Sequence, residues 1–293
     1  MIEDSPEEYL GEIFSEAFFG DTHPLGISIA GTPETVRSFN HEITRNYHER
    51  AFNAANLVIT AAGNVVHDEV VELATAAFTT PKEPAFPDEG VRAPSMAAPI
   101  VIKQRADLEQ AHLVIATPFI SATDDRRYAA DLLANIIGGG TSSRLWQKVR
   151  EERGLAYNVG ASASMYQDCG VFSIFAGSSP EQTREIVELS IAEMRAVVAN
   201  GVTEDELDLA KQQSRASILL SLEDSASRAA ALAQSEMVYG RQIAVEETLA
   251  KIDAVATRDI AAIAREFFTT ENVAFAAIGD LDGDAITRDD LRL

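Results

Sequence analysis

Apolar residues recur every three or four positions in several segments of the chain, which is the spacing of a helix that packs one face against a core. In residues 6–19 this face carries Leu10, Phe14 and Phe18, and Pro6 suits the first helical position. The same spacing predicts further helices at residues 35–47, 67–78, 124–137, 142–152, 180–200, 203–239 and 246–268.

Short continuous apolar runs predict buried strands between these helices. One such run, NLVITAAGN, covers residues 56–64. Others cover residues 99–105, 111–118, 154–166, 170–178 and 271–280. The sequence thus combines helices and strands, and we expect an α+β fold.

A proline-rich segment divides the chain into two parts. The sequence PKEPAFPDEGVRAPS at residues 81–95 carries four prolines, which favour an extended linker. We therefore expect a first part at residues 1–80, a linker at 81–97 and a second part at 98–293. The run NLVITAAGNV in the first part resembles NVAFAAIGDL in the second. This weak repeat predicts two related α+β halves.

The composition excludes several classes of ligand and of site. A net charge of −22 over 293 residues repels DNA, RNA and anionic membranes, and it favours a basic partner or peptide. The acidic residues also serve to keep the surface solvated, which is the simpler interpretation. No apolar run approaches the roughly 20 residues of a membrane span. The single cysteine, Cys169, excludes internal disulfides and cysteine metal clusters, and we expect a packed thiol.

The segment with the most chemical content is GGGTSSRLWQKVREERGLAY at residues 138–157, which joins a glycine run to a short helix and then to a strand. Arg150 and Tyr157 lie seven residues apart in it. A guanidinium or a phenol hydroxyl can donate to the carbonyl oxygen on which charge develops during peptide hydrolysis. Spacing alone also fits a surface ion pair for Arg150 and sheet packing for Tyr157. Gly138, Gly139 and Gly140 fit either a flexible channel lining or a helix cap.

This segment resembles the second half of the pitrilysin/insulinase family of zinc peptidases, which includes the mitochondrial processing peptidase. The opening residues 3–36, from EDSPEEYL to GTPETV, are similar to the family segment that follows the catalytic region. The resemblance implies two halves, each an antiparallel sheet backed by helices, that face each other around a peptide. It implies that Arg150 and Tyr157 bind substrate, and we add Gly138, Gly139 and Gly140 as lining residues. We assign no catalytic residue to this chain.

The zinc signature of that family is not found in the sequence. None of the five histidines forms H-x-x-E-H or H-E-x-x-H. His41 and His48 are seven residues apart and are expected to be solvated, and His23 is expected to be structural. The resemblance places the zinc ligands before the segment with which this chain opens, so the first half is expected to have an incomplete sheet. We expect no metal site here and zinc in the complete family protein or in a partner.

The sequence is consistent with two main functions that belong to different classes. The first is a zinc-peptidase chain that binds an extended peptide, is inactive alone and acts with a zinc-bearing half supplied by another subunit or in a homodimer. The alternative is a non-catalytic structural or scaffold subunit, so whether the chain is an enzyme stays open. A serine hydrolase built on Ser142 or Ser143 is a weaker third, because no histidine is near them in sequence. The cytoplasm is our default location, since any targeting signal would precede Met1.

Overall fold

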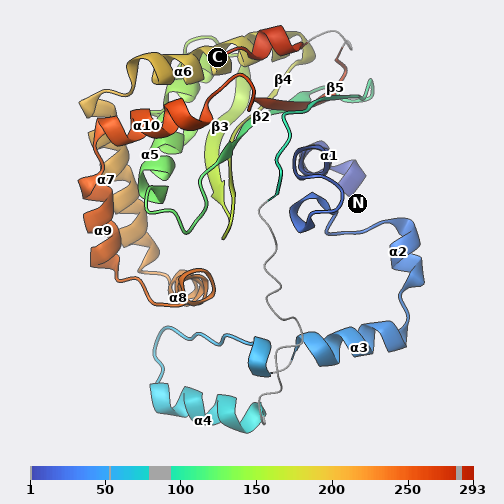
Figure 1. Cartoon of the computed structure of the whole chain (residues 1–293), viewed down its shortest axis with the longest axis vertical. Helices are drawn as coiled ribbons and strands as arrows, with labels where there is room; N and C mark the ends of the chain where they lie inside the picture. Colours follow the sequence, from blue (N-terminus) through green and yellow to red (C-terminus); the bar gives the residue numbers. More distant parts are fainter. Residues whose placement is uncertain (1, 53, 79–93, 282–285) are drawn as a thin grey trace. The chain divides into compact units, whose positions relative to one another are not determined.

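The computed structural model describes residues 2–52, 54–78, 94–281 and 286–293, and it confirms the α+β class (Figure 1). Contacts group the chain into two units. The first unit comprises Met1–Ser28, Ala93–Ser214 and Thr248–Leu293, and the second comprises Ile29–Arg92 and Arg215–Glu247. The opening residues thus pack with the second part of the sequence. The predicted division into a first part at residues 1–80, a linker at 81–97 and a second part at 98–293 stays a prediction.

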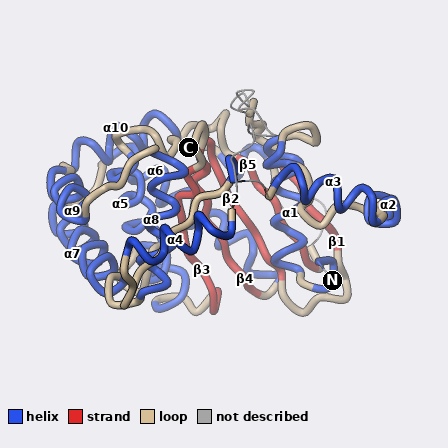
Figure 2. Tube along the Cα trace, turned by 90° about the horizontal axis from the view of Figure 1, so that it is seen from below, coloured by secondary structure: helices blue, strands red, loops and turns tan. Residues whose placement is uncertain are grey.

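The first unit is built on one five-stranded sheet, drawn in red in Figure 2. Its strands are β1 (Ile100–Gln104), β2 (Ala111–Phe119), β3 (Ala156–Met165), β4 (Gly170–Ser178) and β5 (Ala274–Gly279). The strand order is β1-β5-β2-β4-β3, so β3 lies at one edge. The pairings of β2 with β4, β2 with β5 and β3 with β4 are antiparallel, as expected. The pairing of β1 with β5 is parallel, which makes the sheet mixed.

Three helices cover one face of this sheet. They are α5 (Arg127–Gly138), α6 (Thr183–Asn200) and α10 (Thr257–Phe267). Contacts join α5 to β3, α6 to β2 and β4, and α10 to α5, α6 and β2. The facing positions of the strands are fully buried, among them Leu113, Ile115, Phe172 and Ile174. Each such side chain contributes about 1.5–3 kcal/mol on burial, so this side of the sheet is the main core.

The helix α1 (Pro6–Phe19) lies on the opposite face, and its bounds match the prediction. It contacts β5, β2 and β1. Leu10, Phe14 and Phe18 are buried there, and the rings of Phe14 and Phe18 stack with centroids 4.9 Å apart. The strand residues below include Ala116 and Ala276, whose small side chains let the helix approach the sheet. The half of this face that belongs to β4 and β3 extends beyond α1.

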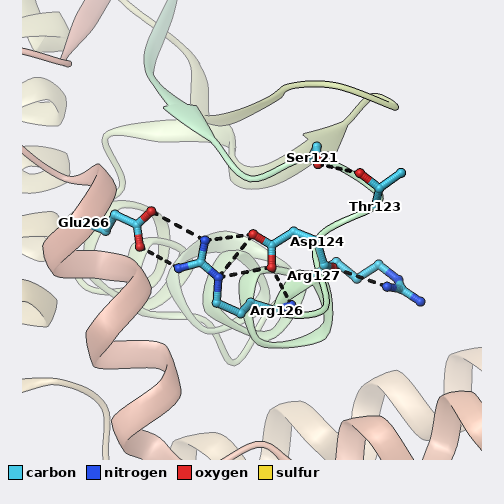
Figure 3. A network of polar contacts seen from close by, with 6 residues as sticks. All are labelled: Ser121, Thr123, Asp124, Arg126, Arg127 and Glu266. Atoms are coloured by element: carbon cyan, nitrogen blue, oxygen red, sulfur yellow. Dashed lines mark hydrogen bonds and ion pairs between the residues drawn. The ribbon is translucent and has the colours of Figure 1, made fainter. Parts of the chain in front are cut away.

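A polar network fixes the start of α5 (Figure 3). The Asp124 carboxylate accepts a hydrogen bond from the backbone N–H of Arg126 at 2.8 Å. The Arg126 guanidinium binds Asp124 and also reaches Glu266 of α10 at 2.6 Å. The hydrogen bond from Arg126 lowers the pKa of Asp124. The helix predicted from residue 124 therefore begins at Arg127, because the three residues before it form this turn.

Two long helical predictions are each divided by a short break. Residues 203–239 form α7 (Glu204–Ser221) and α8 (Ser225–Tyr239), and residues 246–268 form α9 (Val245–Ala254) and α10. The helix predicted at residues 203–239 is interrupted at Asp224. The carboxylate of Asp224 caps α8 by accepting a hydrogen bond from the N–H of Ser227 at 2.8 Å. Short helical turns also occur at Ile2–Asp4, Pro24–Gly26, Ala54–Asn56, Trp146–Glu151, Pro180–Gln182 and Arg288–Leu291.

The second unit contains α2 (Pro33–Ser38), α3 (His41–Ala51), α4 (His67–Ala77) and α8. The helix predicted at residues 35–47 is split because Asn40 caps α3, accepting from the N–H of Ile43 at 3.0 Å. The strand predicted at residues 56–64 is wrong. Val58 and Ile59 are 46% and 52% exposed there, outside any strand.

The physical reason for that error is the lack of a partner. A strand needs a neighbour for its backbone N–H and C=O groups, and within its described residues the second unit contains no other strand. Most of the predicted linker, residues 81–93, lies outside the described residues, and residues 94–99 have no regular secondary structure. In the part of the chain that the structure describes, no helix is long and apolar enough to cross a bilayer.

Candidate functional site

A π-helical turn, η4 (Trp146–Glu151), carries the candidate arginine. The N–H of Glu152 donates to the carbonyl of Gln147, five residues back, at 2.9 Å. Leu145 and Val149 are fully buried on the inner side of the turn. A π turn widens the helix by one residue, and such turns are frequent at functional sites. The predicted helix at residues 142–152 is thus present, but its π geometry has no sequence signal.

Arg150 lies between two aromatic rings on the outer side of this turn. Its Cζ atom is 4.1 Å from the centroid of the Trp146 ring and 4.5 Å from that of the Tyr157 ring. Its Nη1 atom donates to the backbone carbonyl of Tyr157 at 2.8 Å. A planar guanidinium stacks well on aromatic faces, and this stacking uses none of its N–H donors. The sequence-predicted pair is therefore in direct contact.

A β-bulge sets the direction of the Tyr157 side chain. Ala156 pairs with Ser178 and Asn158 pairs with Gly177, so Tyr157 is the extra residue in β3. In a regular strand, Tyr157 and Asn158 would point to opposite faces of the sheet. The bulge breaks this alternation, and both side chains line the same cleft. Tyr157 is 80% exposed, which leaves its hydroxyl accessible.

The cleft has a volume of about 400 Å³ and lies on the face of the sheet that carries α1. A His–Glu pair lines the same cleft as Arg150, with His112 Nδ1 3.3 Å from Glu7 Oε1. Neither residue was singled out from the sequence, because α1 and β2 are far apart along the chain. The cleft is lined by Glu7, Gln110, His112, Trp146, Arg150, Tyr157, Asn158 and Gly177.

A polar network holds the inner side of η4 against α6 and α7. Arg144 binds the Glu206 carboxylate through two bonds of 2.6 and 2.8 Å. Arg144 also lies 3.7 Å from Glu193, which accepts from Lys148 and is only 4% exposed. Glu206 further accepts from the N–H of Thr203 at 2.8 Å, so the predicted capping box of α7 is confirmed. The hydrogen bonds from Arg144 lower the pKa of Glu206 to about 2.

The three glycines of the predicted site lie at the end of α5. A Cβ on Gly138 would lie 2.2 Å from the backbone nitrogen of Ala161, so this glycine allows α5 to touch β3. A Cβ on Gly139 would lie 2.6 Å from the Cα of Asn135, whereas Gly140 faces open space. Of the described residues that line the cleft, none is a glycine of this run. Their part in peptide binding stays a prediction, and the geometry gives Gly138 a packing role.

The residues present do not fit a zinc site. Over the described ranges, no three His, Cys, Asp or Glu side chains converge in a way that could hold a metal ion. The ring of His23 accepts from the N–H of Leu25 at 3.2 Å, so its predicted structural role is confirmed. His41 and His48 are exposed on α3, as predicted. We therefore derive no step through a metal held by this chain.

Two other nucleophile candidates have unsuitable surroundings. Cys169 is buried, and burial raises the pKa of its thiol to about 12, so the thiolate is scarce at neutral pH. The packed thiol predicted from the sequence is confirmed. Ser142 and Ser143 line a cavity of about 30 Å³ together with Glu206. Histidine is missing from the described lining of that cavity, so the arrangement lacks a base for a serine nucleophile.

Comparison with known proteins shows the family of the chain. The protein-family model described as "Peptidase M16 inactive domain" matches residues 38–214 of the chain. The chain belongs to the M16 peptidase family. The resemblance drawn from the sequence is thereby confirmed. An uncharacterized zinc protease of Streptomyces coelicolor is 36% identical over 273 residues, covering 91% of this chain and 59% of that protein. The uncharacterized zinc protease YmxG of Bacillus subtilis is 31% identical over 286 residues, covering 95% of this M16 chain and 67% of YmxG.

Solved structures show the same fold. The peptidase M16 inactive domain from Pseudomonas fluorescens superposes with a TM-score of 0.85 at 23% identity, over 95% of this chain and 66% of that one. A chain of complex III2 from Candida albicans gives a TM-score of 0.86 at 18% identity, over 100% of this chain and 72% of that one. This M16 chain spans about three fifths of the length of its Streptomyces relative.

Proposed function

We propose that this chain binds an extended peptide in the cleft beside Arg150 and Tyr157 and supplies the substrate-binding groups of an M16 peptidase. The observation that carries the proposal is the stack of Arg150 between Trp146 and Tyr157 at the wall of that cleft. The stack fixes a cation and a phenol hydroxyl on one surface. Both can donate to a substrate carbonyl, where negative charge develops during hydrolysis.

The position of β3 suits an extended ligand. It is an edge strand, and an edge strand can accept another strand through its backbone N–H and C=O groups. The bulge at Tyr157 brings this edge to the cleft. The net charge of −22 favours basic peptides over acidic ones. We therefore propose that the peptide runs along β3 and passes Arg150.

The metal and the water that attacks the peptide belong to another segment in this proposal. The names of the relatives as zinc proteases support a peptidase role for the complete protein, and the residues of this chain offer no zinc site among those described. We propose that a zinc-bearing half, in a second subunit or a second copy of the protein, faces this cleft. The chain alone then binds peptide without cleaving it.

Peptide binding to the purified chain tests the proposal. We expect fluorescein-labelled basic peptides to bind, as measured by fluorescence anisotropy, and Arg150→Ala to weaken the affinity about tenfold, or about 1.4 kcal/mol, because the charged donor is lost. Tyr157→Phe should weaken it about fivefold, since it removes only the hydroxyl donor.

Arg153→Ala is the matched control. Arg153 lies three residues further along and pairs with Glu185 at 2.6 Å, away from the cleft. Its replacement should leave the affinity unchanged. Equal affinity in wild type and Arg150→Ala would contradict the proposed site. A chain that binds no peptide at all would instead be a structural subunit. Cleavage of the peptide by the purified chain with added zinc would contradict the assignment of the metal to another segment.

A further inference from the structure

The face of the sheet that carries α1 has a second row of side chains beside the cleft. Residues directly opposite each other in antiparallel pairs share a face. Val114 pairs with Phe175, and Phe175 pairs with Gly160. This row lies next to His112, which pairs with Gly177 in the cleft.

Phe175 is an exposed aromatic residue in the middle of the sheet. It is 41% exposed, although it lies on β4 between β2 and β3. Its ring leans over Gly160, where a Cβ would lie 2.6 Å from the Phe175 Cζ atom. The ring is one wall of a hollow that is lined mainly by apolar residues, as ligand pockets in proteins are.

The other wall of the hollow is α1. Leu10, Gly11 and Phe14 of this helix face Phe175 across a cavity of about 270 Å³. Gly11 has no atom within 4 Å of the place where its Cβ would be, so the helix leaves space there. The cavity shares Glu7, His112 and Asn158 with the 400 Å³ cleft of Arg150 and Tyr157. The two spaces therefore adjoin each other.

We propose that this cavity is a side-chain subsite that takes an apolar or aromatic residue of the bound peptide. The inference rests on the proposed function, because the peptide backbone would lie in the adjoining cleft. The volume is sufficient, since an apolar cavity of about 150 Å³ already holds a benzene molecule. A charged side chain would lose its hydration against Leu10, Phe14 and Phe175, because the polar lining residues Glu7 and His112 are those that the cavity shares with the cleft.

Filling the cavity from α1 tests the subsite. Gly11→Leu adds a side chain into empty space and raises the helix propensity of α1, so the variant is expected to fold. The probes are labelled peptides of alanine and lysine in which one phenylalanine is moved along the sequence. In wild type the best phenylalanine peptide should bind about tenfold tighter than its alanine counterpart. In Gly11→Leu this preference should disappear.

Glu16→Leu is the control, because Glu16 is an exposed residue of the same helix outside both spaces. It should keep the preference for phenylalanine. Arg150→Ala separates the two proposals: it should weaken both peptides equally and leave their ratio intact. If the ratio is unchanged in Gly11→Leu, or if wild type shows no preference, the subsite is wrong even where peptide binding itself is confirmed.

A small probe tests the cavity when no peptide binds. N-acetylphenylalanine amide should shift the backbone amide NMR signals of Gly11 and Gly160 in wild type, whereas N-acetylalanine amide should not. A shift of the Gly160 signal that vanishes in Gly11→Leu supports the subsite even if the proposed peptide function fails. Signals that do not move with N-acetylphenylalanine amide overturn it.

Discussion

Single residues decide the geometry of the candidate site. Tyr157 reaches the cleft because it is the extra residue of a β-bulge, and Arg150 is held by the rings on both sides of it. Gly154 has a φ of 64°, a backbone conformation that glycine adopts readily, and so allows the chain to turn from η4 into β3. Each of these features involves only a few residues, yet its geometry depends on the residues that pack against it.

The glycine run offers a prediction at this scale. Gly138→Ala should destabilise the protein by about 1–3 kcal/mol, because the new methyl group would overlap the backbone of Ala161. Gly140→Ala places the same methyl group in open space and should change stability by less than about 0.5 kcal/mol. Urea denaturation of both variants measures the difference. Equal stability of the two would show that the close approach of α5 to β3 is not rigid.

At the scale of elements, the π turn η4 joins the core to the cleft. Its inner side is tied to α6 through Glu193 and to α7 through Glu206, while its outer side presents Trp146 and Arg150. The carboxylate of Glu193 is buried and has two cationic partners, Arg144 and Lys148. A buried charge of this kind is destabilising when one partner is removed. The network therefore fixes the turn that carries the stack.

The pKa of Glu206 gives this element a pH dependence. Its pKa is lowered from 4.5 to about 2, so the bond to Arg144 contributes fully above pH 4.5 and is lost as the pH falls toward 2. Trp146 is the only tryptophan of the chain and lies on the same turn. We expect the fluorescence emission of Trp146 to change as the pH falls from 4.5 toward 2. At neutral pH, the Glu206→Gln variant should already show the emission that the wild-type protein shows at low pH.

Glu185→Gln is a suitable control for that experiment. Glu185 pairs with Arg153 at 2.6 Å, but both side chains are nearly half exposed, and such surface pairs contribute little. The Trp146 emission of the Glu185→Gln variant should follow the pH profile of the wild-type protein. If Glu206→Gln also follows the wild-type profile, the network does not position η4. Far-ultraviolet circular dichroism in the same samples separates a local change from global unfolding.

At the scale of the whole molecule, the two units differ in how much apolar surface they bury. The first unit has a core on both faces of its sheet. In the second, none of the described residues of α2, α3, α4 and α8 is buried. Several of their large apolar side chains are about half exposed or more, among them Val36, Tyr47, Leu73 and Met237. Burial of apolar area is the main stabilising contribution to a fold, so the second unit is expected to be the less stable one.

Hydrogen exchange tests this difference. Backbone amides of α3 and α4 should exchange with solvent orders of magnitude faster than those of β2, β4 and β5, because local opening of a unit without a core costs little free energy. Mass spectrometry of peptic fragments after exchange gives the comparison. Protection of α3 equal to that of β4 would contradict the expectation and would require a covering contact for its apolar face.

The sequence by itself determined where most of the helices and strands lie, and it indicated Arg150 and Tyr157 as candidate site residues. Helix α1 has the bounds that its apolar spacing predicts, since that spacing is local and the buried face follows from it. Arg150 and Tyr157 were selected because their segment resembles the family, and the structure places them in contact. In the same way, the capping box of Thr203 and Glu206 was readable because both partners lie within one turn.

Tertiary structure alone decided the rest. The runs NLVITAAGNV and NVAFAAIGDL are similar in sequence, yet only the second forms a strand, β5, because β1 and β2 are there to pair with it. The parallel pairing of β1 with β5, the bulge at Tyr157 and the meeting of Glu7 with His112 likewise depend on segments distant in sequence. Strand pairing and cleft formation join groups that no local pattern connects, whereas helix formation satisfies the backbone within one segment.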